Sequence, residues 1–224
     1  MNPATRRYIA PHLRLVYSAD VVDRFVNQPP RPPRPTAWSD LGCFNGPGTR
    51  DPRVAVAVYA KLGLHPILLH GIDGDGQCTC GHIDCTDNRG KHPVHKGWQS
   101  AGLDVVRLDR ALARNWRLNV GLRMGLQPSG STLIALDVDG DRSLLAPLEA
   151  KHGPLPETLT ARTSRGWHFI YRVPADAGIR NRVRLAPGVD VRAEGGQIVV
   201  SPSRHASGTF YTWINIREPA ELFS

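Results

Sequence analysis

Long apolar segments are missing from this 224-residue chain, and both lysine and cysteine are scarce. No stretch approaches the roughly 20 apolar residues that a membrane-spanning helix needs. The first residues also lack the apolar core of a secretory signal peptide. Both absences favour a cytoplasmic, reducing location, in which the four cysteines are better suited to metal binding than to disulfides.

Lysine is the rarer of the two basic residues, with four Lys against 24 Arg. The formal charge of +8 therefore rests on guanidinium groups, which can pair with a phosphate through two parallel hydrogen bonds. This favours a nucleic-acid partner, although a gene rich in G and C would encode the same bias. Segment 180–184 contains three arginines, which could contact nucleic-acid phosphates or form a solvated loop.

Three of the four cysteines fall in one polar loop, followed by a histidine, in the pattern Cys78-x-Cys80-x4-Cys85-x6-His92. The surrounding residues, 71–96, are rich in glycine and polar side chains and cannot build a core of their own. A zinc ion held tetrahedrally by thiolates and imidazole would fix such a loop. The sequence therefore predicts a structural zinc site.

The fourth ligand of this site is open at the level of sequence. His92 is preferred because it lies beyond a turn and can fold back, with His82 and His95 as alternatives. A set of reduced surface cysteines without a metal is the other interpretation, although clustered exposed thiols would be an oxidation liability. Cys43 stands alone and is expected to be structural or incidental.

Two aspartates, Asp137 and Asp139, end the apolar run that begins at Leu133. Residues two apart in a strand point to the same face, so these carboxylates project side by side. Neighbouring carboxylates repel each other unless a cation lies between them, and Mg²⁺ takes oxygen ligands while keeping room for substrate phosphates. Two such ions, about 4 Å apart, can hold the attacking and leaving oxygens of an in-line displacement. A solvated turn would also explain the pair, because Gly140 and Asp141 follow.

Two further signatures follow along the chain. Ser164 to Gly166 form a tight turn between strand-like runs, and such a turn lets backbone N–H groups approach phosphate oxygens. His168 could donate a hydrogen bond to the same phosphates, although a hairpin with a solvent-facing histidine would also fit. Asp190 opens another alternating run and could be a third carboxylate. Together the three signatures could hold divalent metals and a triphosphate, which points to nucleotidyl transfer.

In this order, D-x-D, S-x-G-x-H and an apolar strand with Asp190 resemble the archaeo-eukaryotic primase superfamily. More closely, they resemble the N-terminal domains of bifunctional primase/polymerases from replication proteins of plasmids, phages and integrated elements. The resemblance covers about residues 51–214 and includes the segments Gly90-Lys91-His92-Pro93, Gly97-Trp98, Asn119–Gly125 and Ile198–Ser203. The chain departs from it at Ser201, where proline is frequent, and at Arg165, where a small residue is more usual.

The resemblance implies roles for particular residues and cofactors. Asp137, Asp139 and Asp190 would be the carboxylate ligands of two Mg²⁺ or Mn²⁺ ions, and a zinc-bearing insertion would precede the G-K-x-P element. The triphosphate would be held by the turn and by the histidine beside it, that is by Ser164, Arg165, Gly166 and the catalytic His168. Further candidates near the nucleotide are Asn119, Arg123, Arg192 and Ser203, although single polar residues in strands often only satisfy backbone groups.

The organisation of the chain separates an N-terminal appendage, residues 1–50, from a catalytic domain, residues 51–224. The appendage would combine a helix over 8–26 with the proline-rich linker 29–35. Helices are expected at 52–62, 108–116 and 143–152, and strands near 66–70, 119–124, 132–138, 158–163, 167–173, 189–193, 197–201 and 209–214. This order predicts an α+β fold with a mixed or antiparallel sheet under the site, and the resemblance implies a core related to the RNA-recognition fold.

The leading functional hypothesis is a primase, a polymerase or both, acting on a single-stranded DNA template, a primer and nucleoside triphosphates. The chain lacks a P-loop, because Cys85 and His92 stand where Gly and Ser or Thr would be required. The sequence therefore predicts no helicase or ATPase motor within these residues, and any helicase domain or partner would lie outside them. The alternatives are a non-catalytic replication-initiation or single-strand-binding module and a metal-dependent nuclease.

Overall fold

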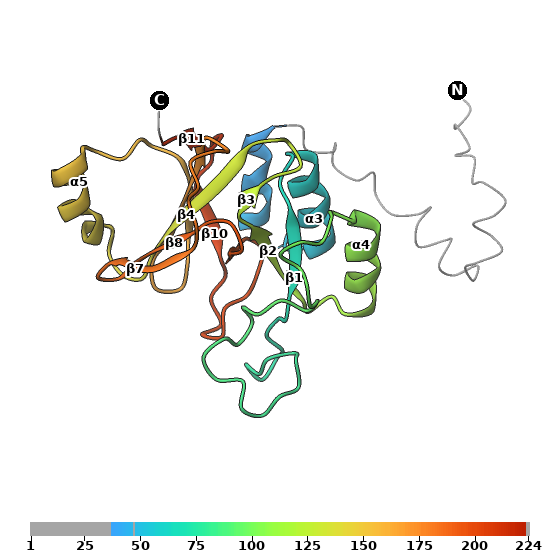
Figure 1. The fold of residues 1–224 in the computed structure, drawn as a ribbon. Helices are drawn as coiled ribbons and strands as arrows, with labels where there is room; N and C mark the ends of the chain where they lie inside the picture. Colours follow the sequence, from blue (N-terminus) through green and yellow to red (C-terminus); the bar gives the residue numbers. More distant parts are fainter. Residues whose placement is uncertain (1–36, 47, 223–224) are drawn as a thin grey trace, which may run out of the picture. The chain divides into compact units, whose positions relative to one another are not determined.

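The structure, a computed structural model, describes residues 37–46 and 48–222. The helix predicted over 8–26 and the linker over 29–35 lie outside the described residues. The described part combines helices with antiparallel sheets (Figure 1), which confirms the predicted α+β class. A relation to the RNA-recognition fold stays a prediction.

The described helical segments are two 3-10 helices and three α-helices: η1 (Trp38–Asn45), α3 (Pro52–Lys61), α4 (Val105–Arg114), η2 (Arg142–Leu145) and α5 (Ala146–His152). Helix α3 begins as the sequence predicts, because the Asp51 side chain accepts a hydrogen bond from the Arg53 N–H and Pro52 occupies the first turn. Helix α4 begins three residues earlier than predicted, because Asp104 caps it. The single helix expected over 143–152 is divided into η2 and α5.

The strands form two sheets. The smaller has the order β1-β2-β9, from β1 (Pro66–Leu69), β2 (Asn119–Arg123) and β9 (Gln197–Val199). The larger has the order β10-β5-β6-β4-β8-β7, from β10 (Thr212–Asn215), β5 (Leu159–Arg162), β6 (Trp167–Val173), β4 (Thr132–Val138), β8 (Val189–Arg192) and β7 (Arg182–Ala186). Two short strands extend it, with β3 (Gly125–Leu126) antiparallel to β4 and β11 (Ala220–Glu221) parallel to β6.

Strand β4 is central to the larger sheet and pairs along its length with β6 and, over its second half, with β8. One face of β6 contributes Phe169, Tyr171 and Val173 to one apolar cluster, while Ile170 on the opposite face belongs to another. Both faces are therefore covered, which fixes the register, because a slip of one residue would exchange the two faces.

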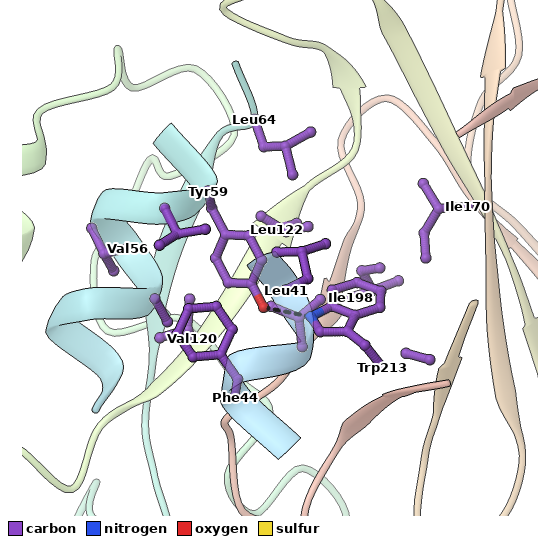
Figure 2. Close-up of a cluster of buried hydrophobic side chains, with 14 of the residues drawn as sticks. Leu41, Phe44, Val56, Tyr59, Leu64, Val120, Leu122, Ile170, Ile198 and Trp213 are labelled. Carbon is purple, nitrogen blue, oxygen red and sulfur yellow. Dashed lines mark hydrogen bonds between the residues drawn. The ribbon is translucent and has the colours of Figure 1, made fainter. Parts of the chain in front are cut away.

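The main core lies where the two sheets meet the helices (Figure 2). Tyr59 of α3 is fully buried, donates a hydrogen bond to the Ser201 carbonyl and accepts one from the Trp213 indole at 3.0 Å. Leu41 and Phe44 of η1 pack into the same cluster. Residues 38–45 therefore contribute to the core although they precede the predicted boundary at residue 50, which stays a prediction.

Within ranges 37–46 and 48–222, no helix combines the length and the apolar character that crossing a membrane requires.

Candidate active site

Three of the predicted functional residues lie in one row across three neighbouring strands. Asp137 on β4 is directly opposite His168 on β6 and directly opposite Asp190 on β8. Directly opposed residues of antiparallel strands project to the same face. The sheet register therefore gathers side chains that are 31 and 53 positions apart in the sequence, at the end of β4 where the chain leaves the sheet.

The carboxylate of Asp137 is held between a histidine and an arginine. His168 Nε2 lies 3.3 Å from Asp137 Oδ1, while the Arg192 guanidinium lies 3.1 Å from Asp137 Oδ2 and 2.8 Å from Asp190 Oδ2. Burial acts to raise the pKa of Asp137, but the hydrogen bond and charge of His168, together with Arg192, hold the pKa of this carboxyl well below its usual range. Asp137 is therefore ionised at neutral pH.

A pocket of about 310 Å³ opens beside this row. Asp137, Asp139, His168 and Arg192 line it, together with Asp87, Asn88, Lys91, Thr163, Ser164, Arg165, Gln197, Ile198, Val199 and Tyr211. Asp139 is exposed, and Arg165 lies 3.6 Å from its carboxylate. The pocket thus joins three carboxylates to several cationic side chains, a combination suited to phosphate groups accompanied by cations.

The turn between β5 and β6 is built differently from the sequence-based expectation. The backbone N–H groups of Arg165 and Gly166 both donate to Thr163 Oγ1, at 3.2 and 2.8 Å. These two N–H groups are therefore engaged inside the turn, whereas Ser164 and Arg165 line the pocket. Gly166 is buried and does not line the pocket. It is required by the neighbouring strand, because a Cβ there would lie 1.7 Å from the Val138 carbonyl oxygen.

Gly166→Ala is therefore expected to destabilise the protein by about 3 kcal/mol, the upper range for overpacking a close contact. Denaturant unfolding monitored by circular dichroism would measure the change. Gly102→Ala is the matched control, because a Cβ there meets nothing within 4 Å. Equal stability of the two variants would contradict the close approach of the turn to β4.

Three further candidates are held by backbone groups outside the pocket. The Asn119 amide donates to the carbonyls of Gly90 and Arg204, both at 2.8 Å, and accepts from the Arg204 N–H. The Ser203 hydroxyl accepts a hydrogen bond from the Val120 N–H and donates one to the Val120 carbonyl. The Arg123 guanidinium donates to the carbonyls of residues 99, 101 and 126. The structure does not bring these three to the pocket, whereas it places Arg192 at its centre.

Lys91 and Tyr211 were not singled out as site residues, and both line the pocket. Burial, followed by the charge of Arg165, lowers the pKa of Lys91, while Asp139 and Asp137 oppose this shift. Tyr211 is 3% exposed and stacks on the His168 ring with 6.0 Å between centroids. The sequence motif G-K-x-P, here Gly90 to Pro93, already contained Lys91 and could have identified it as a site residue. Tyr211 lies near the end of the range, about residues 51–214, that the resemblance covers.

The cysteine-rich loop gathers the predicted ligand set. Cys78, Cys80, Cys85 and His92 offer ligand atoms that all lie within 4.8 Å of one another. His92 Nε2 lies 3.3 Å from Cys78 Sγ and 3.5 Å from Cys85 Sγ. The cluster could therefore hold a metal ion, and its imidazole comes from His92 rather than from the exposed His82.

The donor set fits a soft divalent ion. Burial, followed by the hydrogen bonds that the protonated Cys85 thiol donates to Cys78 and Cys80, raises the pKa of Cys85 to about 12. Without a cation the three thiols therefore cannot all ionise, whereas thiolates are the form that binds zinc. The ring of His70 stacks on His92 with 4.5 Å between centroids and fixes its orientation. This loop lies below the β1-β2-β9 sheet in Figure 1 and carries Lys91 into the pocket.

The fold and the pocket define an α+β domain with a pocket that combines carboxylates and cationic side chains, and with a loop whose cysteines and histidine could hold a metal ion. The model of the bifunctional DNA primase/polymerase N-terminal family, Prim-Pol, matches residues 55–223. The chain belongs to this family, as the order of its motifs predicts. Membership implies a primase- or polymerase-like nucleotidyltransferase domain that binds DNA and nucleotides. No curated protein matches the chain.

Proposed function

We propose that the protein is a template-directed nucleotidyltransferase that joins nucleoside triphosphates and releases pyrophosphate, as a DNA primase, a DNA polymerase or both. The observation that supports this most directly is the row Asp190–Asp137–His168, which borders a pocket lined by Ser164, Arg165 and Lys91. Carboxylates for divalent cations and cationic groups for a triphosphate lie within one small volume. A replication role for a plasmid, phage or integrated element, a cytoplasmic location and a helicase partner stay predictions.

The residues present fit divalent cations. Asp137 and Asp190 already share one guanidinium, so this corner of the sheet accommodates a positive charge between two carboxylates. Asp137, Asp139 and Asp190 would hold Mg²⁺ or Mn²⁺, which when bound would lower the pKa of the attacking hydroxyl and neutralise charge on the leaving pyrophosphate.

The side chains of the pocket have separable tasks in this proposal. Lys91, Arg165 and the Ser164 hydroxyl bind and orient the triphosphate, so that most of the rate comes from positioning and electrostatics. His168 holds Asp137 in position through its Nε2 atom and contributes to the triphosphate site. Tyr211 packs against the His168 ring and limits its movement. Zinc on the Cys78, Cys80, Cys85 and His92 cluster would hold the loop that carries Lys91.

The test is incorporation of labelled nucleotides on primed and unprimed single-stranded templates with Mg²⁺ or Mn²⁺. Asp137→Ala/Asp139→Ala is expected to lower incorporation on the order of a hundredfold or more. Asp176→Asn, an exposed carboxylate in the turn after β6, is the control and is expected to behave as wild type.

The outcomes separate the functional classes. Product on both templates identifies a primase-polymerase, and product on the primed template alone identifies a polymerase. Template binding without product from the wild type would replace the proposal with the binding module. Cleaved strands without pyrophosphate would replace it with the nuclease.

A further inference from the structure

Helix α4 presents a stripe of arginine side chains that the catalytic pocket does not use. Arg107, Arg110 and Arg114 are spaced by three and four residues, which places them on one face of the helix, and Arg117 follows directly after it. All four are exposed. Among the described residues, none of them takes part in a salt bridge. We refer to these four residues as the α4 arginine stripe.

The acidic residues of α4 leave this charge uncompensated. Asp104 caps the helix by accepting the Arg107 N–H at 2.9 Å. Asp109 is held by both branches of the Arg53 guanidinium, at 2.7 and 2.9 Å. The opposite side of α4 buries Leu108 and Leu112 in the core, so the orientation of the helix is fixed. The stripe therefore faces solvent as a rigid positive surface.

An exposed tryptophan stands at the end of the stripe. Trp116 is 71% exposed, and the Arg117 guanidinium lies 5.5 Å from the centre of its ring. Proteins that bind single-stranded nucleic acid combine a positive surface that follows the backbone with aromatic rings on which bases stack. The stripe and Trp116 supply both.

Shared neighbours link Arg107, the first residue of the stripe, to the catalytic pocket. On the outer face of the β1-β2-β9 sheet, Tyr211 from the catalytic pocket and Trp98 share an apolar cluster with residues of β1 and β9. Trp98 lines a second, smaller pocket of about 70 Å³ that Arg107 also lines. Because β1 and β9 flank β2, they lie about 10 Å apart. The Arg107 end of the stripe and the catalytic pocket are therefore separated by the width of this one sheet.

We propose that the α4 arginine stripe and Trp116 bind the single-stranded nucleic acid that runs to or from the catalytic pocket. The arginines contact its phosphates, and Trp116 stacks on a base. The identity of this strand as the template rests on the proposed function, whereas the binding itself needs no catalysis.

The β7 segment is the competing basic surface. Arg180 and Arg182 are exposed there, but the exposed large apolar residue of that segment is Val183, which offers no ring for stacking. The segment also adjoins acidic groups, because the Arg184 N–H donates to Asp190 and Arg180 lies beside Glu194. These features favour the α4 arginine stripe as the binding surface for single-stranded nucleic acid. The arginines of the β7 segment serve as a matched control in the binding experiment.

Binding of a labelled single-stranded oligodeoxynucleotide, followed by fluorescence anisotropy without nucleotides and without added Mg²⁺ or Mn²⁺, tests the arginines. Arg110→Ala/Arg114→Ala is expected to weaken binding about tenfold and to reduce the slope of log K against log[salt] by about 1.4, since each phosphate contact contributes about 0.7. Arg180→Ala/Arg182→Ala removes the same charge and is expected to leave both unchanged. The proposal would be overturned if Arg180→Ala/Arg182→Ala lost as much DNA affinity as Arg110→Ala/Arg114→Ala, or more.

Trp116 gives an independent readout. The protein has five tryptophans, so the quenching that disappears in Trp116→Phe reports on this ring alone. Trp116→Phe is expected to keep the affinity and lose that part of the DNA-induced quenching, whereas Trp116→Ala weakens binding about fivefold or more. Unchanged affinity in Trp116→Ala together with unchanged quenching in Trp116→Phe would refute stacking. Because neither measurement uses turnover, an inactive wild type would refute the proposed function and leave this result interpretable.

Discussion

Arg192→Ala is expected to lower the free energy of unfolding by about 3 kcal/mol at neutral pH without added divalent cations, as when one partner of a partly buried ion pair is removed. Arg192 is the cation shared by Asp137 and Asp190, whose side chains are 18% and 19% exposed. Its removal leaves two neighbouring carboxylates to repel each other. Mn²⁺ is expected to restore much of the loss, because it would take the place of the guanidinium between them. Urea unfolding with and without Mn²⁺ measures both effects.

Arg142→Ala is the control, because its pair with Glu149 is on the surface, with half of the arginine side chain exposed. Arg142→Ala is expected to lower the free energy of unfolding by less than about 1 kcal/mol, and Mn²⁺ is expected not to change this loss. A cation-independent loss in Arg192→Ala would contradict a divalent-cation site at these carboxylates.

The pH dependence of the free energy of unfolding follows from the ion pair between Asp137 and Arg192. The pKa of Asp137 is lowered in the folded protein, so its stabilising contribution is present above the ordinary carboxyl range, near pH 4, and is lost as pH falls through the lowered value. In Arg192→Ala one cause of this lowering is absent. The acid-induced loss of stability that Asp137 causes should therefore be smaller than in the wild type and should be complete at a higher pH.

Cys78→Ser/Cys85→Ser is expected to remove about one zinc ion per chain and to lower Tm by roughly 10 °C, which corresponds to about 3 kcal/mol for a domain of this size. The free energy of structural zinc binding is folding free energy, because the ligand set does not exist in the unfolded chain. Elemental analysis and calorimetry would measure the two effects. Incorporation should fall as well, because Lys91 directly precedes the ligand His92.

Cys43→Ser is the matched control, because Cys43 is exposed and lies outside the cluster. It should keep both the metal content and the Tm. A folded wild type that contains no metal and has the same Tm as Cys78→Ser/Cys85→Ser would contradict the zinc prediction.

The elements that the sequence predicted best are the alternating apolar strands. Strands β4 and β6 have the bounds that the pattern predicts, because burial on both faces leaves a clear signal. Strand β7 was missed, because it is a largely exposed edge strand that contains two arginines and carries no apolar pattern. The contribution of η1 to the core was also not predictable, since Leu41 and Phe44 are buried only by partners distant in the sequence.

The sequence motifs pointed to the residues of the candidate site, but they did not predict which of these side chains contact one another. The motifs named Asp137, His168 and Asp190 one by one, whereas their alignment depends on the register of three strands. The bond between Asp137 and Arg192 likewise depends on that register. Asn119 and Ser203 lie outside the pocket, and buried polar side chains that satisfy backbone groups carry the same sequence signal as ligand contacts.

The row across β8, β4 and β6 has a consequence for how this site can change over evolution. The spacing between neighbouring functional groups is the inter-strand distance, about 4.8 Å, and it is set by main-chain hydrogen bonds. A substitution at any of the three positions alters the chemistry while the spacing persists. Insertion or deletion of one residue within β4 would instead turn Asp137 toward the core and bring Leu136 or Val138 to the surface. The strand can therefore diverge in residue type far more readily than in length.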